Sequence, residues 1–314
     1  MKSLWIVGGW VLSLFLLVGA AMPLRAETVP DRLAAAWDQY TAGKYEDAIK
    51  TFEAALKEDA KNAEAIGGIG GCLMKLGRYE EAIPKLRKGA EGLPDRSWYP
   101  QTLACALANS GAWEEASQAA REAIRKGSTD ALCHAIIGEY ARQQKQWKEA
   151  QEELELAVSV DPGYAFALSA LGNLHRDLQH PGLAIALYRE SVRFDPKATA
   201  VMNEAARLLI TKVGYVDEGI EMAKKSIAVD AKNEFAFYIL SEGYAKKGMW
   251  KESLDAAQSA VKLAPTDAWD HYSAARALKE LGREDEARAE VKKAIELDKT
   301  LDAAKQLDKE LAAR

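Results

Sequence analysis

The sequence predicts an all-α fold, an α-solenoid made of about eight helix–turn–helix repeats. Three observations support this prediction: the chain resembles itself every 34 residues, small residues recur at three fixed places in each repeat, and a glycine often separates the two halves of a repeat. A fixed period of this length is typical of arrays in which each unit packs on its neighbours. We therefore expect one continuous array to follow a short amino-terminal segment.

The composition limits the class of protein. The 314 residues include 42 Lys plus Arg against 47 Asp plus Glu, and 48% are hydrophobic. These values are typical of a folded protein and exclude a disordered or collagen-like chain. Proteins that bind nucleic acid are usually basic, so no nucleic-acid partner is expected.

Residues 1–26 have the pattern of an export signal. Met1-Lys2-Ser3 is followed by eighteen uncharged residues, Leu4–Ala21, and the small Ala26 precedes the expected cleavage point. Glu27 would then be the first mature residue. The alternative is an uncleaved anchor, because about 20 apolar residues span a bilayer. Cleavage implies an exported, periplasmic or extracellular protein, and retention implies one anchored in the inner membrane and facing the periplasm.

The array itself is expected to occupy residues 29–301. Seven blocks have 34 residues, and the sixth has 35 because of an extra residue near Gly214-Tyr215. The carboxy-terminal residues 302–314 indicate a closing helix with a polar outer face, which such arrays need. The eight blocks are 29–62, 63–96, 97–130, 131–164, 165–198, 199–233, 234–267 and 268–301.

Small residues mark the helix crossings. All 24 residues at block positions 8, 20 and 27 are Ala, Gly or Ser, as Ala36, Ala150 and Ala294 illustrate. A larger side chain at a crossing would push two helix axes apart. Glycines that would end the first helix of a pair lie between the halves at Gly43, Gly77, Gly111, Gly248 and Gly282.

These residues resemble the tetratricopeptide repeat. Besides the small residues at 8, 20 and 27, aromatic residues stand at position 17 and prolines at position 32, although Pro181 and Glu284 depart from the pattern at position 17. The resemblance covers residues 29–301 and implies a right-handed superhelix whose first helices line a concave groove. The matching residues are Tyr45, Tyr79, Trp113, Trp147 and Trp250 at position 17, and Pro94, Pro162, Pro196 and Pro265 at position 32.

No motif for catalysis or cofactor binding stands out. The sequence lacks a Gly-x-Ser-x-Gly nucleophile elbow and a Gly-Lys-Ser/Thr phosphate loop, and its four histidines show no two-histidine metal spacing on one helix face. We expect no enzyme activity, no cofactor and no metal site. The three cysteines, Cys72, Cys105 and Cys133, are expected to be small apolar fillers with free thiols.

The candidate partner-binding residues lie at positions 2, 5 and 9 of the first helices, which share one helix face. Aromatic residues flanked by Arg and Glu are typical of binding hot spots. The alternative is that the position 2 aromatics cover the junction with the preceding repeat. The candidates are Phe235, Tyr238, Glu242, Trp269, Tyr272, Arg276 and Arg207, with Trp98, Phe166, Arg142, Asn173 and Arg176 in earlier blocks.

Gly67, Gly68, Gly70 and Gly71 lie in one predicted helix, where each costs about 0.8 to 1.0 kcal/mol relative to Ala. Position 8 requires a small residue and accounts for Gly70. For the other three, the sequence leaves two interpretations: close approach of a partner backbone to the groove, or drift in a weakly constrained repeat.

Together these features predict a non-catalytic, exported scaffold that binds a protein or peptide segment in its groove, in cell-envelope assembly, transport or secretion. The alternative is a carbohydrate-handling module of a polysaccharide export system, because Trp and Tyr faces also stack on sugar rings. Membrane contact is expected only through an uncleaved amino-terminal segment. Self-association stays open.

Overall fold

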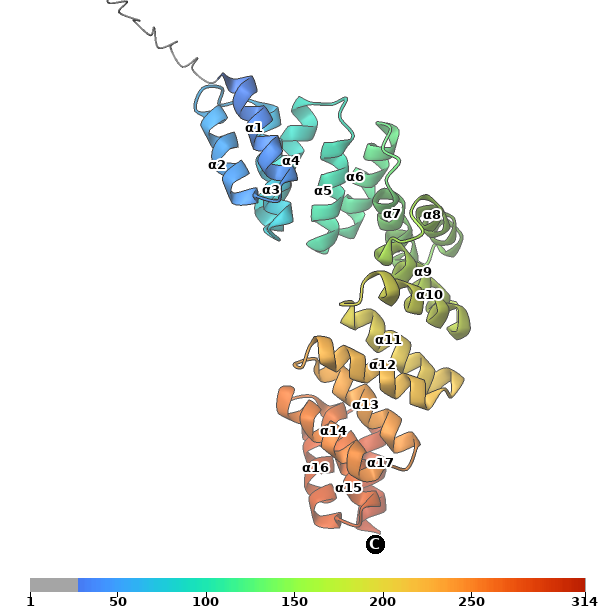
Figure 1. The fold of residues 1–314 in the computed structure, drawn as a ribbon. Helices are drawn as coiled ribbons and strands as arrows, with labels where there is room; N and C mark the ends of the chain where they lie inside the picture. The colour runs from blue at the N-terminus through green and yellow to red at the C-terminus, as the bar shows by residue number, and fades with distance from the viewer. Residues whose placement is uncertain (1–27, 314) are drawn as a thin grey trace, which may run out of the picture.

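A computed structural model describes residues 28–313, which form seventeen α-helices and one π-helical turn, with no strand in this part of the chain. The helices follow one another in a curved array from α1 to α17 (Figure 1). The predicted all-α solenoid is confirmed. The expected export signal and its cleavage residues, Ala26 and Glu27, lie outside the described residues. Within them, no helix is both long enough and apolar enough to cross a membrane.

The helices form eight antiparallel pairs and a final single helix. The first helices are α1 (Val29–Thr41), α3 (Ala63–Lys75), α5 (Trp98–Asn109), α7 (Ala131–Gln143), α9 (Ala165–Asp177), α11 (Thr199–Leu208), α13 (Glu234–Lys246) and α15 (Ala268–Glu280). The second helices are α2 (Tyr45–Leu56), α4 (Tyr79–Gly92), α6 (Trp113–Arg125), α8 (Trp147–Val160), α10 (Pro181–Phe194), α12 (Val216–Val229), α14 (Trp250–Leu263) and α16 (Glu284–Leu297). The last helix is α17 (Asp302–Ala312).

The small residues lie where the helices of a pair cross, and all 24 of them are buried. A Cβ atom on Gly138 of α7 would lie 2.6 Å from Cγ of Leu154 in α8, so the two helices pack at the distance that only a small residue permits. Where serines replace alanine, their hydroxyls find partners across the crossing. Ser241 Oγ donates to the carbonyl of Ser253 at 2.9 Å, and Ser253 Oγ donates to the carbonyl of Ser241 at 3.0 Å.

The glycines of α3 make room for aromatic rings of the protein itself. A Cβ on Gly68 would lie 2.7 Å from Phe52 Cε2, and one on Gly71 would lie 2.5 Å from Trp98 Cη2. Phe52 belongs to α2 and Trp98 to α5, so the glycines serve packing on both sides of α3. The two interpretations taken from the sequence, approach of a partner backbone and drift, are therefore wrong: the space is filled from within the chain.

The extra residue of the sixth repeat is absorbed by a π-helical turn, η1 (Leu209–Val213), which continues α11 and ends at Gly214 in the left-handed conformation, with φ +77°. The wider turn places Ile210 in the core, where it is 1% exposed. The second helix adapts to it, because a Cβ on Gly219 would lie 3.1 Å from Ile210 Cδ1. A π-bulge of this kind often accompanies a functional site.

The carboxy-terminal helix α17 covers the last pair. Leu307 and Leu311 pack into the same apolar cluster as Leu278 and Val291 of α15 and α16. Arg288 of α16 donates from Nη2 to the carbonyl of Leu311 at 2.9 Å. The end of the array is thereby shielded from water, as a terminal cap requires.

Candidate partner-binding groove

Four cavities are lined mainly by residues of the first helices and of the turns that follow them, and we call the surface that they mark the groove. Neighbouring first helices such as α7 and α9, or α13 and α15, contact each other, which brings their side chains together although the residues are about one repeat apart in sequence. The four cavities have volumes of about 310 to 690 Å³. A volume of this order is typical of ligand sites.

The carboxy-terminal part of the groove contains the residues singled out from the sequence. Phe235 stacks on Tyr238 with ring centroids 6.0 Å apart and planes 10° apart. Trp269 meets Tyr272 edge to face, with centroids 5.9 Å apart. Phe235 is 37% exposed and Trp269 is 47% exposed, which is high for side chains of this size. In each of these two aromatic pairs, on successive first helices, one ring is exposed to solvent and the tyrosine beside it is half-buried.

Charged side chains link the two aromatic pairs. Arg276 forms an ion pair with Glu242 across α13 and α15, and its Cζ lies 5.8 Å from the centroid of the Tyr272 ring. Arg207, Tyr238 and Glu242 line one cavity of about 330 Å³. Burial, followed by the negative charge of Glu242, raises the pKa of Tyr238 to about 12, so its hydroxyl stays protonated and can donate a hydrogen bond at neutral pH. The seven predicted residues therefore form one connected surface.

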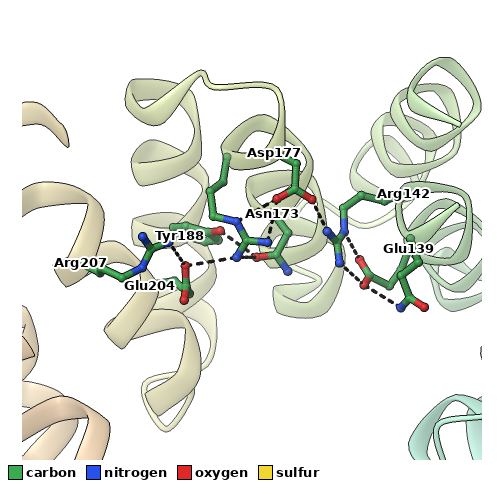
Figure 2. Close-up of polar contacts among 9 residues, drawn as sticks. Glu139, Arg142, Asn173, Asp177, Tyr188, Glu204 and Arg207 are labelled. Atoms are coloured by element: carbon green, nitrogen blue, oxygen red, sulfur yellow. Dashed lines mark hydrogen bonds and ion pairs between the residues drawn. The ribbon is translucent and has the colours of Figure 1, made fainter. Parts of the chain in front are cut away.

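The central part of the groove holds a row of ion pairs that sequence reasoning found only in part. Arg142 donates to Glu139 through Nε at 2.8 Å and through Nη2 at 2.7 Å, and its Nη1 pairs with Asp177 of the next first helix. Figure 2 shows Asp177 and Glu139 on either side of the Arg142 guanidinium. The arginine is held by two carboxylates from two helices and is only 15% exposed.

The same row continues into the sixth repeat. Arg176 pairs with Asp177 at 2.9 Å and with Glu204 at 3.2 Å, and Glu204 also accepts from Arg207 Nη2 at 2.8 Å. Asn173 accepts from the hydroxyl of Tyr188 at 2.8 Å (Figure 2). Arg207 therefore belongs to two parts of the groove. The acids Glu139 and Asp177 were missed, since nothing in the sequence distinguishes them from solvated helix residues.

The amino-terminal part of the groove is aromatic. Trp37, Tyr40, Trp98 and Tyr99 line a cavity of about 310 Å³. Trp37 meets Trp98 edge to face with centroids 5.1 Å apart, and Trp37 Nε1 donates to Glu64 Oε1 at 2.9 Å. Of these residues, only Trp98 was among the sequence candidates. The signal for Trp37 and Tyr40 was available at positions 9 and 12 of the first block.

Cysteines and potential metal ligands do not form a reactive site in the part of the chain that the structure describes. Cys72, Cys105 and Cys133 carry free thiols, and burial is the main cause that raises the pKa of Cys133 to about 11. Residues 28–313 hold no cluster of three or more His, Cys, Asp or Glu side chains arranged for a metal ion.

Known proteins share this architecture. Two family models described as tetratricopeptide repeat match the chain, one over residues 33–97 and 137–199 and the other over residues 271–301, which together make up half of the sequence. A TPR repeat-containing protein, YpiA of Bacillus subtilis (strain 168), is 26% identical over 220 residues, which are 66% of this chain and 50% of the relative. Hsp70-Hsp90 organizing protein 2 of Arabidopsis thaliana is 26% identical over 215 residues, 67% of this chain and 36% of that protein.

The chain thus spans half or less of the length of these two relatives. Among solved structures, the APC/C hetero-tetramer Cut9-Hcn1 matches with a TM-score of 0.60 and 14% identity, over 89% of this chain and 55% of the other. At this identity the likeness shows the fold alone.

Proposed function

This chain belongs to the tetratricopeptide repeat family, whose members mediate protein–protein interaction, and on that premise we propose that its groove binds an extended segment of a partner protein. The main contacts come from the carboxy-terminal part of the groove. Tyr238 and Tyr272 anchor the segment, while Arg207, Glu242 and Arg276 fix its orientation. The protein acts as a non-catalytic scaffold.

One observation carries this proposal: the aromatic pairs of α13 and α15, each with one exposed and one half-buried ring, are joined by the Arg276–Glu242 ion pair into one surface. Single exposed apolar side chains are common on protein surfaces, whereas aromatic rings that adjoin one another in a patch rimmed by charged groups are typical of an interaction site. Rings held by neighbouring rings lose little side-chain entropy on binding, which favours their use as anchors. The ion pair adds fixed polar groups that can select the partner.

The proposal includes export to the cell envelope, where the scaffold would serve assembly, transport or secretion. It is supported by the uncharged run Leu4–Ala21 and the small residue Ala26 before the expected cleavage point. The positive start of the chain at Lys2 favours an orientation that places the repeats outside the cytoplasm.

Peptide selection on the purified repeats would test the groove assignment. A phage-displayed random peptide library is selected on the wild-type protein, and the dissociation constants of the best peptides are measured by fluorescence anisotropy. We expect Tyr238→Ala and Tyr272→Ala each to weaken binding by about 1 to 3 kcal/mol. Both side chains also pack against apolar core clusters, so circular dichroism and thermal unfolding of each variant check that a loss of binding is not a loss of fold.

Tyr215→Ala is the matched control, since Tyr215 is 63% exposed, lies in the turn before α12 and lines none of the four groove cavities. It should leave the dissociation constant unchanged. Full affinity of the Tyr238/Tyr272 double variant for every selected peptide would reject this part of the groove as the binding surface.

A further inference from the structure

A second feature of the groove is a strongly basic cavity where the first helices of the fourth, fifth and sixth repeats end. Its volume is about 690 Å³. Five of its eleven lining residues are cationic and one is acidic. The charged residues are Arg142, Lys145, Arg176, Arg207, Lys212 and Asp177.

The three arginines of the cavity are held in place by acidic side chains, whose negative charges balance theirs. Glu139, Asp177 and Glu204 supply three carboxylates for three guanidinium groups. Arg207 uses only one of the five N–H groups of a guanidinium, on Glu204, and is 34% exposed. The three arginines are therefore fixed in position before a partner binds, and Arg207 keeps N–H groups that can donate hydrogen bonds to it.

The excess positive charge of the cavity comes from its two lysines. Lys145 and Lys212 are exposed and have no ion-pair partner among residues 28–313. The cavity thus carries about two positive charges that the protein itself does not neutralise, although the whole chain has a formal net charge of −5. A local excess of this sign attracts anions.

The backbone at this cavity also departs from the pattern of the other repeats. Lys145 and Gln179 have φ values of +59° and +61° and are the only non-glycine residues with positive φ in the described chain. In the corresponding turns of the other repeats a glycine takes this conformation, as Gly77 and Gly111 do. A non-glycine residue there costs of order 1 to 3 kcal/mol. Both exceptions line the basic cavity, and the π-helical turn places Lys212 beside them.

We propose that this cavity binds an acidic polypeptide segment through two or more carboxylates. Guanidinium groups match carboxylates in planar, two-point hydrogen bonds, and the lysines add long-range attraction. An excess of about two positive charges matches a short acidic stretch, whereas a long polyanion such as RNA carries a negative charge on every phosphate. This inference rests on the proposed function, because it assigns the chemistry of a partner segment in the same groove.

The test measures binding of a fluorescein-labelled twelve-residue peptide with four central Glu residues, and of the same peptide with Gln in their place. We expect the Glu peptide to bind at 50 mM salt, to weaken steeply as salt is raised to 500 mM, and the Gln peptide not to bind. Lys145→Ala with Lys212→Ala should weaken binding of the Glu peptide about tenfold, and Lys145→Glu with Lys212→Glu should abolish it.

Lys225→Ala with Lys251→Ala is the matched control. It removes the same charge from exposed lysines on the second helices α12 and α14 and should leave the affinity unchanged. Equal binding of the two peptides, wild-type affinity in the Lys145/Lys212 reversal, or tighter binding of a twelve-nucleotide RNA would overturn the proposal. If the selected groove peptides still require Tyr238 and Tyr272 in that case, the basic cavity is rejected and the proposed function stands.

Discussion

Tyr99 of α5 occupies the space that a side chain on Gly67 of α3 would take. A Cβ on Gly67 would lie 2.8 Å from Cδ1 of Tyr99 and 3.0 Å from the Cα of Gly89 in α4. Tyr99 is 1% exposed, so the ring has no room to move away. Three helices of two successive repeats therefore meet at one point, and the absence of a side chain at Gly67 is what permits it.

Gly67→Ala should destabilise the protein. Overpacking against Tyr99 costs about 1 to 3 kcal/mol, which exceeds the gain of about 1 kcal/mol in helix propensity. Gly182→Ala in α10 is the control, because a Cβ there meets nothing within 4 Å, and it should be neutral or stabilising. Thermal unfolding followed by circular dichroism compares the two; a Gly67→Ala variant that melts no lower than the wild type would contradict the packing account.

Lys145→Gly should stabilise the fold while weakening binding of the acidic peptide. Relief of the left-handed backbone is expected to raise the free energy of unfolding by about 1 kcal/mol and the melting temperature by about 2 °C. Gly77→Ala is the reciprocal control, since φ is +74° and a Cβ there has open space, so its cost is conformational. It should lower the melting temperature by a similar amount. If Lys145→Gly is instead less stable than the wild type, the Lys145 side chain stabilises the turn, and the account of backbone strain is wrong.

Stability should fall as pH rises from about 4 to 8. Asp270 is 0% exposed, and burial followed by the negative charges of Glu234 and Asp267 raises its pKa to about 8. In the unfolded chain it ionises near 3.8, so between these values the folded state binds more protons and each pH unit costs at most about 1.4 kcal/mol. Chemical unfolding at pH 5 and pH 8 measures the loss.

Asp270→Asn should flatten this dependence, because the amide keeps the shape of the side chain and carries no charge. Its free energy of unfolding should exceed that of the wild type at pH 8 and differ little at pH 5. The exposed Asp255→Asn on α14 should leave the slope as it is. A wild-type slope in Asp270→Asn would assign the pH dependence to other groups.

We predict that the chain is exported and that its mature form begins at or within a few residues of Glu27. Intact-mass measurement of the protein recovered from an envelope fraction determines the first residue of the mature chain. A membrane-bound form that retains Met1 to Ala26 would favour the anchor instead, while the repeats would still face away from the cytoplasm.

The architecture was determined by the sequence alone, because each helix pair packs on its nearest neighbours and the crossing residues recur at a fixed spacing. Ala150 and Gly138 could be placed at a crossing without coordinates, since any larger side chain would separate the helices. The seven groove residues followed from the same register: a helix of known phase directs Tyr238 and Glu242 to one face.

Only the tertiary structure determined the contacts between residues that lie one or two repeats apart. Whether Arg142 reaches Asp177 depends on the rotation of each repeat relative to the next and on long side chains with many rotamers. The contact between Trp37 and Trp98 crosses an intervening helix and exists because Gly71 leaves that helix bare at this point. A 34-residue period specifies the helices and their faces, whereas the curvature of the array selects which side chains meet across it.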